Sequence, residues 1–177
     1  MVITVYADRR VHDVTAVAES LAEAIAETIE PSKVVLYIDR VANGERARRK
    51  RAPLRRALPA NPVPALSAAA EGPDVTILGV WGPVTEHVIT AFDLSRVVLL
   101  LTDDAVTSLR AAQRTLKLCA GLGFGADRIL VVRLVDPKAA ALDGREVAYA
   151  LKREIFASIP MTAGEEEYLL LAKRIFP

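Results

Sequence analysis

The feature that most constrains the fold is an uninterrupted aliphatic run, Val97-Val98-Leu99-Leu100-Leu101. A strand with one face in water alternates apolar and polar residues, whereas a strand buried on both faces does not. The run is also far shorter than the roughly 20 residues of a membrane-spanning helix. It therefore predicts a central strand of a sheet that is covered on both faces.

Other short apolar runs alternate with segments of helical periodicity along the chain. The expected strands are 2–6, 33–38, 74–80, 96–101, 128–134 and 155–159, and the expected helices are 14–29, 85–92, 105–119, 144–152 and 165–175. This alternation predicts an α/β fold with three layers, in which helices cover both faces of a mostly parallel sheet. With 177 residues, the chain is too short for two ordinary domains, so we expect a single α/β domain over 1–177.

The helix expected over 105–119 has a clear start and a clear buried side. Asp103 or Asp104 is expected to cap its first turn. Val106, Leu109, Leu116 and Cys119 fall on one side of it and are expected to be core. The glycines of Gly121-Leu122-Gly123-Phe124-Gly125 end the helix instead of opening one, so they do not form a dinucleotide-binding loop.

Residues 42–73 form an irregular basic and proline-rich segment, for which we expect a flexible loop with one short helix over 45–52. Seven cationic residues cluster there: Arg46, Arg48, Arg49, Lys50, Arg51, Arg55 and Arg56. The net charge of the chain is +1, so the remainder carries −6 without them. Such a cluster predicts contact with an anionic surface (DNA, lipid or an acidic partner), and a solvated loop is the alternative.

Cysteine and histidine are too few for a metal or disulfide framework. Cys119 is the single cysteine and is expected to be core, while His12 and His87 are the only histidines and lack any metal-binding spacing. The N-terminal residues lack the pattern of a secretory signal. We expect a soluble cytoplasmic protein.

Several segments resemble the MinD/ParA family of P-loop ATPases, and most closely its CpaE/TadZ branch, which is associated with pilus assembly. The segment 91–102 is similar to the family's valine-rich strand and the residues before it, and Ser108-Leu109-Arg110-Ala111-Ala112-Gln113-Arg114 is similar to the helix that follows. Ile129 to Arg133 matches the strand that leads to the family's adenine-contacting asparagine, and Phe156 to Pro160 matches a late turn. The resemblance implies the P-loop NTPase-like fold, of MinD/ParA type, over nearly the whole chain.

The resemblance also places the family's phosphate-binding loop, K-G-G-x-G-K-T, on residues 9–15 without a gap. The residues there are Arg9, Arg10, Val11, His12, Asp13, Val14 and Thr15. Such a loop needs glycines that let backbone N–H groups surround phosphate, and a lysine that reaches the terminal phosphates. Here all three glycines are replaced, the phosphate lysine is Val14, and only the threonine is retained, as Thr15.

A second acidic motif, D-x-P-P-G, is also altered. It matches 79–83, so the metal-organising aspartate is Gly79, although Asp39 matches the acidic position after the second strand. Trp81 follows the third strand, where it either fills the space of a nucleotide or anchors a partner. We expect no catalytic residue and no bound cofactor or metal.

These observations predict a non-catalytic, pseudo-ATPase member of the MinD/ParA type that acts in assembly or positioning, in a CpaE/TadZ-like pilus system. The resemblance implies a homodimer or a heterodimer with a related ATPase. Two alternatives remain open: an active ATPase that uses Arg9 and Arg10 to hold the phosphates of ATP with magnesium, and a module that binds nucleic acid or another anionic surface through 46–56. The C-terminal helix is expected to pack on the sheet, and a peripheral contact with the inner membrane face is the alternative.

Overall fold

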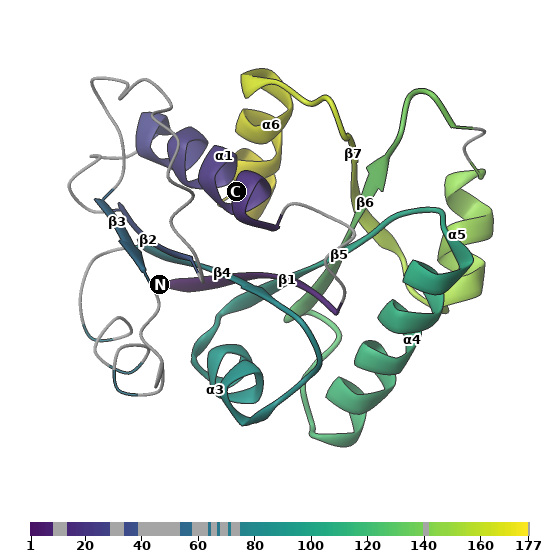
Figure 1. Cartoon of the computed structure of the whole chain (residues 1–177), viewed down its shortest axis with the longest axis horizontal. Coiled ribbons are helices and arrows are strands. Elements are labelled where there is room, and N and C mark those ends of the chain that lie inside the picture. Colours follow the sequence, from purple (N-terminus) through teal and green to yellow (C-terminus); the bar gives the residue numbers. More distant parts are fainter. Residues whose placement is uncertain are drawn as a thin grey trace.

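The computed structural model describes residues 1–8, 14–28, 34–38, 54–57, 64, 67, 71, 75–139 and 142–176. Strands and helices alternate along the chain, as the apolar runs predict (Figure 1). The strands are β1 (Val2–Ala7), β2 (Val34–Ile38), β3 (Leu54–Ala57), β4 (Val75–Trp81), β5 (Val97–Thr102), β6 (Ile129–Val135) and β7 (Ile155–Pro160). The helices are α1 (Val14–Thr28), α3 (Glu86–Leu94), α4 (Val106–Gly121), α5 (Gly144–Leu151) and α6 (Glu165–Ile175).

The described strands form one seven-stranded sheet in the order β3-β2-β4-β1-β5-β6-β7, and every neighbouring pair is parallel. β1 lies in the middle, where Ile3 is in register with Ile77 of β4 and with Val97 of β5. Because all strands run the same way, their carboxyl ends meet at one edge of the sheet. That edge is where open α/β sheets bind ligands.

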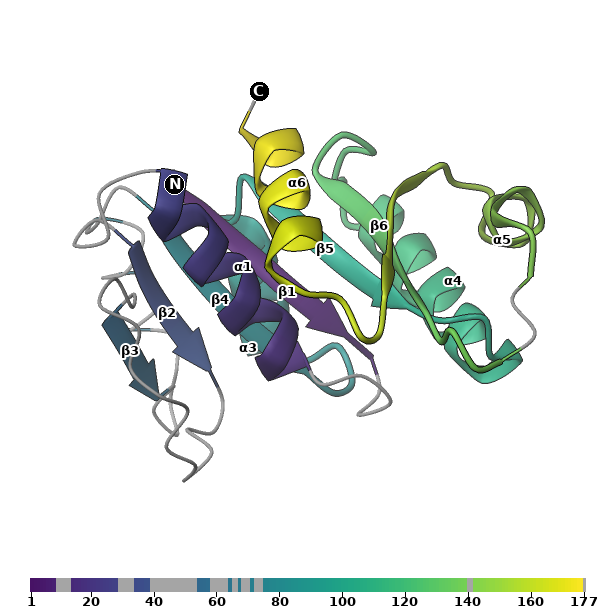
Figure 2. The same cartoon turned by 90° about the horizontal axis from the view of Figure 1, so that it is seen from above.

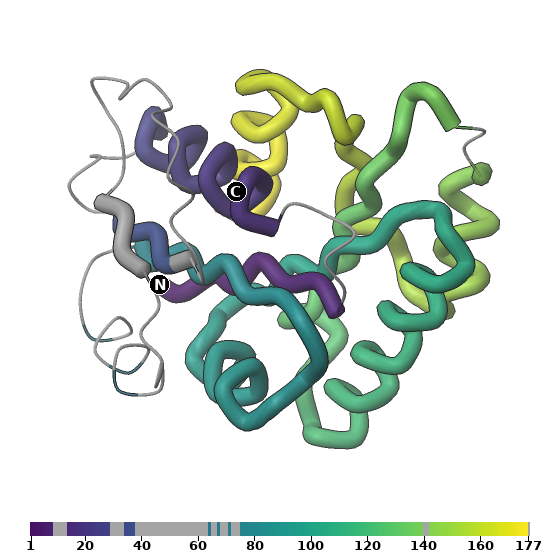
Figure 3. The backbone as a smooth tube through the Cα atoms, viewed as in Figure 1, coloured from purple at the N-terminus to yellow at the C-terminus, as the bar shows by residue number. Residues whose placement is uncertain are grey.

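Helices cover both faces, as predicted. α1 and α6 lie over one face, while α3, α4 and α5 lie over the other (Figures 1 and 2). The tube view shows α1 and α6 side by side above the sheet (Figure 3). Two hydrophobic cores result, one on each side, and β1 contributes alternate residues to both: Ile3 and Val5 to one, Val2 and Tyr6 to the other.

β3 corrects the expectation that 42–73 is irregular throughout. Leu54–Ala57 pairs with β2, with Leu36 in register with Arg55 and Tyr37 with Arg56. Its sequence, Leu-Arg-Arg-Ala, has no alternating pattern, so pairing with a formed neighbour overrides its weak local preference. Charged residues suit this position, because an edge strand with arginines resists pairing with another molecule. The helix expected over 45–52 lies outside the described residues.

The start of α4 also differs from the expectation. Its N-cap is Ala105, and no side chain caps it. Asp103 accepts a hydrogen bond from the Ala105 N–H, whereas Asp104 turns to Arg133. Val106, expected in the core, is 62% exposed, whereas Ser108 and Leu109 are the residues of the first turn that are buried. Leu109, Leu116 and Cys119 are buried as predicted.

The C-terminal helix packs on the fold, as expected. α6 lies beside α1, and its residues Tyr168, Leu171 and Ala172 are buried in the shared core. Its first turn is acidic and its last turn basic, which complements the helix dipole. Among the described helices, none is both long and apolar enough to cross a bilayer.

A buried ion pair joins two turns at the carboxyl edge. The guanidinium of Arg133, at the end of β6, donates to both carboxylate oxygens of Asp104, at 2.7 and 2.6 Å. Arg133 also donates to the Leu142 carbonyl, and the Leu142 N–H donates to Asp104 at 3.1 Å. The hydrogen bonds from Arg133 lower the pKa of the Asp104 carboxyl below its ordinary value. This cluster fixes the segment before α5 to the turn before α4.

Replacing Asp104 with alanine should lower the free energy of unfolding by about 3 kcal/mol, because a buried guanidinium then lacks its counter-charge. Urea unfolding at pH 7 measures this loss, with the exposed Glu154→Ala as the control that should change little. The folded-state pKa of Asp104 is depressed, so its stabilisation is present above the unfolded value of about 3.9 and is lost as the pH falls through the folded value. The difference between the two proteins should therefore persist to about pH 4 and shrink below it. Equal stability at pH 7 would contradict the assignment.

Candidate functional site

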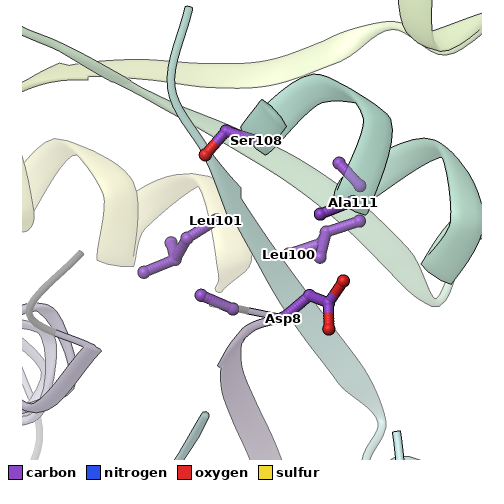
Figure 4. Close-up of a pocket in the computed structure, with 7 residues that line it drawn as sticks. Asp8, Leu100, Leu101, Ser108 and Ala111 are labelled. Atoms are coloured by element: carbon purple, nitrogen blue, oxygen red, sulfur yellow. The ribbon is translucent and has the colours of Figure 1, made fainter. Parts of the chain in front are cut away.

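A small hollow lies at the carboxyl edge, between the ends of β1 and β5 and beneath the first turns of α4 (Figure 4). It is lined by Ala7, Asp8, Leu100, Leu101, Ser108, Ala111 and Ala112. The space within it that a water-sized sphere can occupy is about 10 Å³. A single buried water needs roughly 10–15 Å³ on the same measure. The hollow is thus at the expected place in the fold but is small for a nucleotide.

The polar groups around this hollow are few. The Asp8 carboxylate lies 3.4 Å from the guanidinium of Arg114 on α4, in an ion pair open to solvent on the arginine side. Ser108 is buried in the first turn of α4, and Figure 4 shows it on the opposite side of the hollow from Asp8. The remaining lining is aliphatic. A carboxylate here disfavours a phosphate, because two like charges at 4 Å repel by about 4 kcal/mol at an effective dielectric of 20.

The first turn of α1 carries the two described residues of the segment 9–15, which the resemblance aligns with a phosphate-binding loop. Val14 is 2% exposed and belongs to the hydrophobic core, where it packs with residues of the sheet and α6. Thr15 follows it and is half-buried. Val14, which the resemblance aligns with a phosphate-binding lysine, therefore has an apolar side chain that is part of the hydrophobic core.

The end of β4 carries the residues that the resemblance aligns with an acidic motif. Gly79 is in register with Val5 on one side and with Ile38 on the other, and it supplies no side chain to the edge. Trp81, the last residue of β4, is half-buried and packs against the core beneath α1 and α6. Both roles expected for Trp81, filling the space of a nucleotide and anchoring a partner, stay predictions.

A hydroxyl network holds the turn after β4. The hydroxyl of Tyr6, which is fully buried, donates to the Gly82 carbonyl at 2.7 Å, and the Gly82 N–H donates to the Ala7 carbonyl at 3.0 Å. Gly82 has a φ of +110°, a conformation that residues with a side chain rarely adopt. Burial raises the pKa of the Tyr6 phenol well above its ordinary value, so the hydroxyl remains a donor.

Sequence reasoning finds some of these groups and misses others. It identifies Tyr6 only as a strand residue, since no local pattern shows that its hydroxyl meets a turn 76 residues away. It likewise places Arg133 inside a strand, and an arginine in an apolar run is the one signal that could have suggested a buried partner. His87 is exposed, and its ring contacts only the Thr85 hydroxyl among the described residues.

Many predicted site residues lie outside the described residues: Arg9, Arg10, Val11, His12, Asp13, Asp39, Arg46, Arg48, Arg49, Lys50 and Arg51. Arg55 and Arg56 are placed on the edge strand β3, by their backbone. Of the remaining predicted residues, the structure describes Val14 and Thr15 at the start of α1, and Gly79 and Trp81 near the end of β4. It adds Tyr6, Asp8 and Arg114 at the same edge.

These described residues do not fit ATP with magnesium. Val14 offers no charge to a phosphate, and Gly79 offers no carboxylate to organise a metal. Thr15 alone retains a hydroxyl that could contact magnesium. Within the described segments, no three histidine, cysteine, aspartate or glutamate side chains gather as a metal site would need.

Removing the Tyr6 hydroxyl should loosen the turn after β4. Tyr6→Phe leaves the Gly82 carbonyl without its donor, which costs about 1–2 kcal/mol of stability. Hydrogen exchange should accelerate at the Gly82 and Val84 amides more than in β5 or α4. Tyr149→Phe is the matched control, because Tyr149 is 87% exposed and should leave these rates unchanged. Unaltered exchange at Gly82 in Tyr6→Phe would show that the hydroxyl does not hold the turn.

Neither a protein-family model nor a curated protein sequence matches this chain. Solved structures do match in fold. MinD cell division protein from Aquifex aeolicus gives a TM-score of 0.76 at 16% identity, with 99% of this chain and 96% of that chain covered. The septum site-determining protein MinD from Pyrococcus horikoshii OT3, complexed with Mg-ADP, gives 0.76 at 12% identity, covering 98% and 95%.

A ParA family ATPase from Chlorobium tepidum TLS gives a TM-score of 0.70 at 15% identity, with 99% of this chain and 91% of that chain covered. These identities are too low to transfer a function. They agree with the seven-stranded parallel sheet and its covering helices. The chain therefore has the α/β fold of the MinD/ParA ATPases.

Proposed function

We propose that this protein is a non-catalytic, pseudo-ATPase relative of the MinD/ParA type that acts in assembly or positioning. The proposal depends mainly on the position and the burial of Val14. At the position of the phosphate lysine, an apolar side chain is 2% exposed and forms part of the hydrophobic core. A buried valine cannot neutralise the negative charge of a nucleotide's phosphates. Its packing in the hydrophobic core gives it a structural role.

Two further observations support the same proposal. Gly79 supplies no carboxylate where the family has its metal-organising aspartate. In the turn that follows, the Gly82 carbonyl and N–H are hydrogen-bonded to Tyr6 and Ala7 of β1, so these groups already have partners within the protein. Phosphoryl transfer requires charge stabilisation and a positioned nucleophile, and these residues provide neither.

A protein without nucleotide chemistry would act through its partners. MinD from Aquifex aeolicus, which shares this fold, has also been solved in a MinC:MinD cell division protein complex. By analogy, we propose a protein partner for this chain, either a second copy or a related active ATPase. The CpaE/TadZ-like resemblance of the segments 91–102 and 156–160 extends the proposal to a pilus-assembly system in the cytoplasm, with contact at the inner membrane face as one setting.

Calorimetric titration of ATP and ADP, each with magnesium, tests the proposal on the purified protein. We expect no binding heat at low or moderate salt, because the described residues offer no cation to the terminal phosphates. A P-loop ATPase with an intact lysine, titrated under the same conditions, serves as the positive control. Micromolar binding would overturn the proposal in favour of a working site.

Two variants then identify what such a working site would use. If nucleotide binds, Arg9→Ala with Arg10→Ala should abolish it under the alternative in which these arginines hold phosphate. Retarded migration of DNA with a steep salt dependence would favour the nucleic-acid alternative, since each neutralised phosphate adds roughly −0.9 to the log–log slope. The cationic cluster 46–56 is the expected site in that case.

A further inference from the structure

The solvent side of α4 is strongly cationic. Arg110, Arg114 and Lys117 follow one another at four and three residues, which places them on one side of the helix. All three are exposed, and α4 contains no aspartate or glutamate. We call this side, together with the exposed apolar residues described below, the α4 face.

Little in the described structure neutralises this charge. Arg114 meets Asp8 at 3.4 Å, in a pair whose arginine side chain is 63% exposed. For Arg110 and Lys117 the described residues provide no ion-pair partner. The first turn of α4 contains no acidic residue, and the carboxylates of Asp103 and Asp104 lie before it, at the opposite end of the helix from Lys117. Burial raises the pKa of the Cys119 thiol on α4. The positive charge of Arg153, which follows α5, opposes that rise.

The same side also exposes large apolar side chains. Val106 is 62% exposed at the start of α4, and Leu118 and Leu122 are 41% and 49% exposed near its end. Leu118 and Leu122 are four residues apart, so they lie one turn apart on one flank of the cationic row. Aliphatic groups at both ends of a cationic row indicate a surface for a ligand that is acidic and apolar at once.

We infer that the α4 face docks an acidic amphipathic helix of a partner protein. Its acidic side would meet Arg110 and Lys117, and its apolar side would cover Leu118 and Leu122. α4 has 16 residues and is about 24 Å long, which suits a partner helix of about four turns. Charge complementarity requires that the partner carry negative charge. The exposed leucines favour a helix with apolar side chains over a nucleic-acid backbone, because phosphates gain nothing from aliphatic contact. This inference does not depend on the state of the nucleotide site.

Two fluorescent 16-residue peptides of identical composition test the inference. In one, glutamates and leucines form two adjacent stripes along the same side of a helix, and in the other the same residues are scrambled so that no stripes form. Fluorescence anisotropy should show at least tenfold tighter binding of the amphipathic peptide to the full chain. Equal binding of the two peptides would mean that the α4 face attracts them by charge alone, and this result would overturn the inference.

Protein variants locate the site. Arg110→Glu with Lys117→Glu, and separately Leu118→Ser with Leu122→Ser, should each weaken the amphipathic peptide at least tenfold. Arg96→Glu with Lys138→Glu is the matched control, because it reverses two exposed cations away from α4 and should leave binding unchanged. Circular dichroism and thermal unfolding establish that each variant is folded. Unchanged binding in both α4 variants would overturn the inference.

Two other occupants are outcomes of the same experiment. If a 20-base-pair DNA competes the peptide away and binds the Leu118→Ser, Leu122→Ser variant normally, the face binds nucleic acid and the inference fails. If the protein is a dimer by sedimentation and the Arg110→Glu, Lys117→Glu variant is a monomer, the occupant is a second copy. The exposed acidic first turn of α6, Glu165 to Glu167, would then be its counterpart.

Discussion

The rest of the structure depends on the burial of β1 from both sides. All six of its residues are buried, and its alternate side chains enter two separate cores. A strand in this position requires a parallel neighbour on each side and a helix layer on each face. β4, β5, α1 and α3 meet that requirement. The carboxylates of Asp8 and Asp104 lie beyond the strands at the carboxyl edge, where each pairs with an arginine.

At that edge, several polar groups of the described residues pair within the chain itself. In open α/β sheets, this edge is where ligands bind, and helix N-termini there can hold phosphate. Here the Gly82 carbonyl accepts a hydrogen bond from Tyr6, and Arg133 donates to Asp104 and Leu142. These groups therefore have their hydrogen bonds completed within the protein.

Most of the fold could be predicted from the sequence, because apolar runs and helical periodicity report burial directly. The long run at 97–101 became β5, and the stripe from Val14 became α1. β3 could not be predicted, since its four residues form a strand only by pairing with β2. The stripe that begins at Val14 also predicts the buried side of this helix, and Val14 is 2% exposed. Contacts such as the hydrogen bond from Tyr6 to Gly82 join residues far apart in the chain, and no local sequence pattern predicts them.

The pairing of β1 has a consequence for synthesis on the ribosome. β1 is made before both of its neighbours in the sheet, because Ile3 pairs with Ile77 of β4 and with Val97 of β5. This apolar strand must therefore remain without its sheet until more than half of the chain has left the exit tunnel. During that interval α1 is the local element able to shield it. Chaperone demand during translation should fall most sharply when β5 emerges.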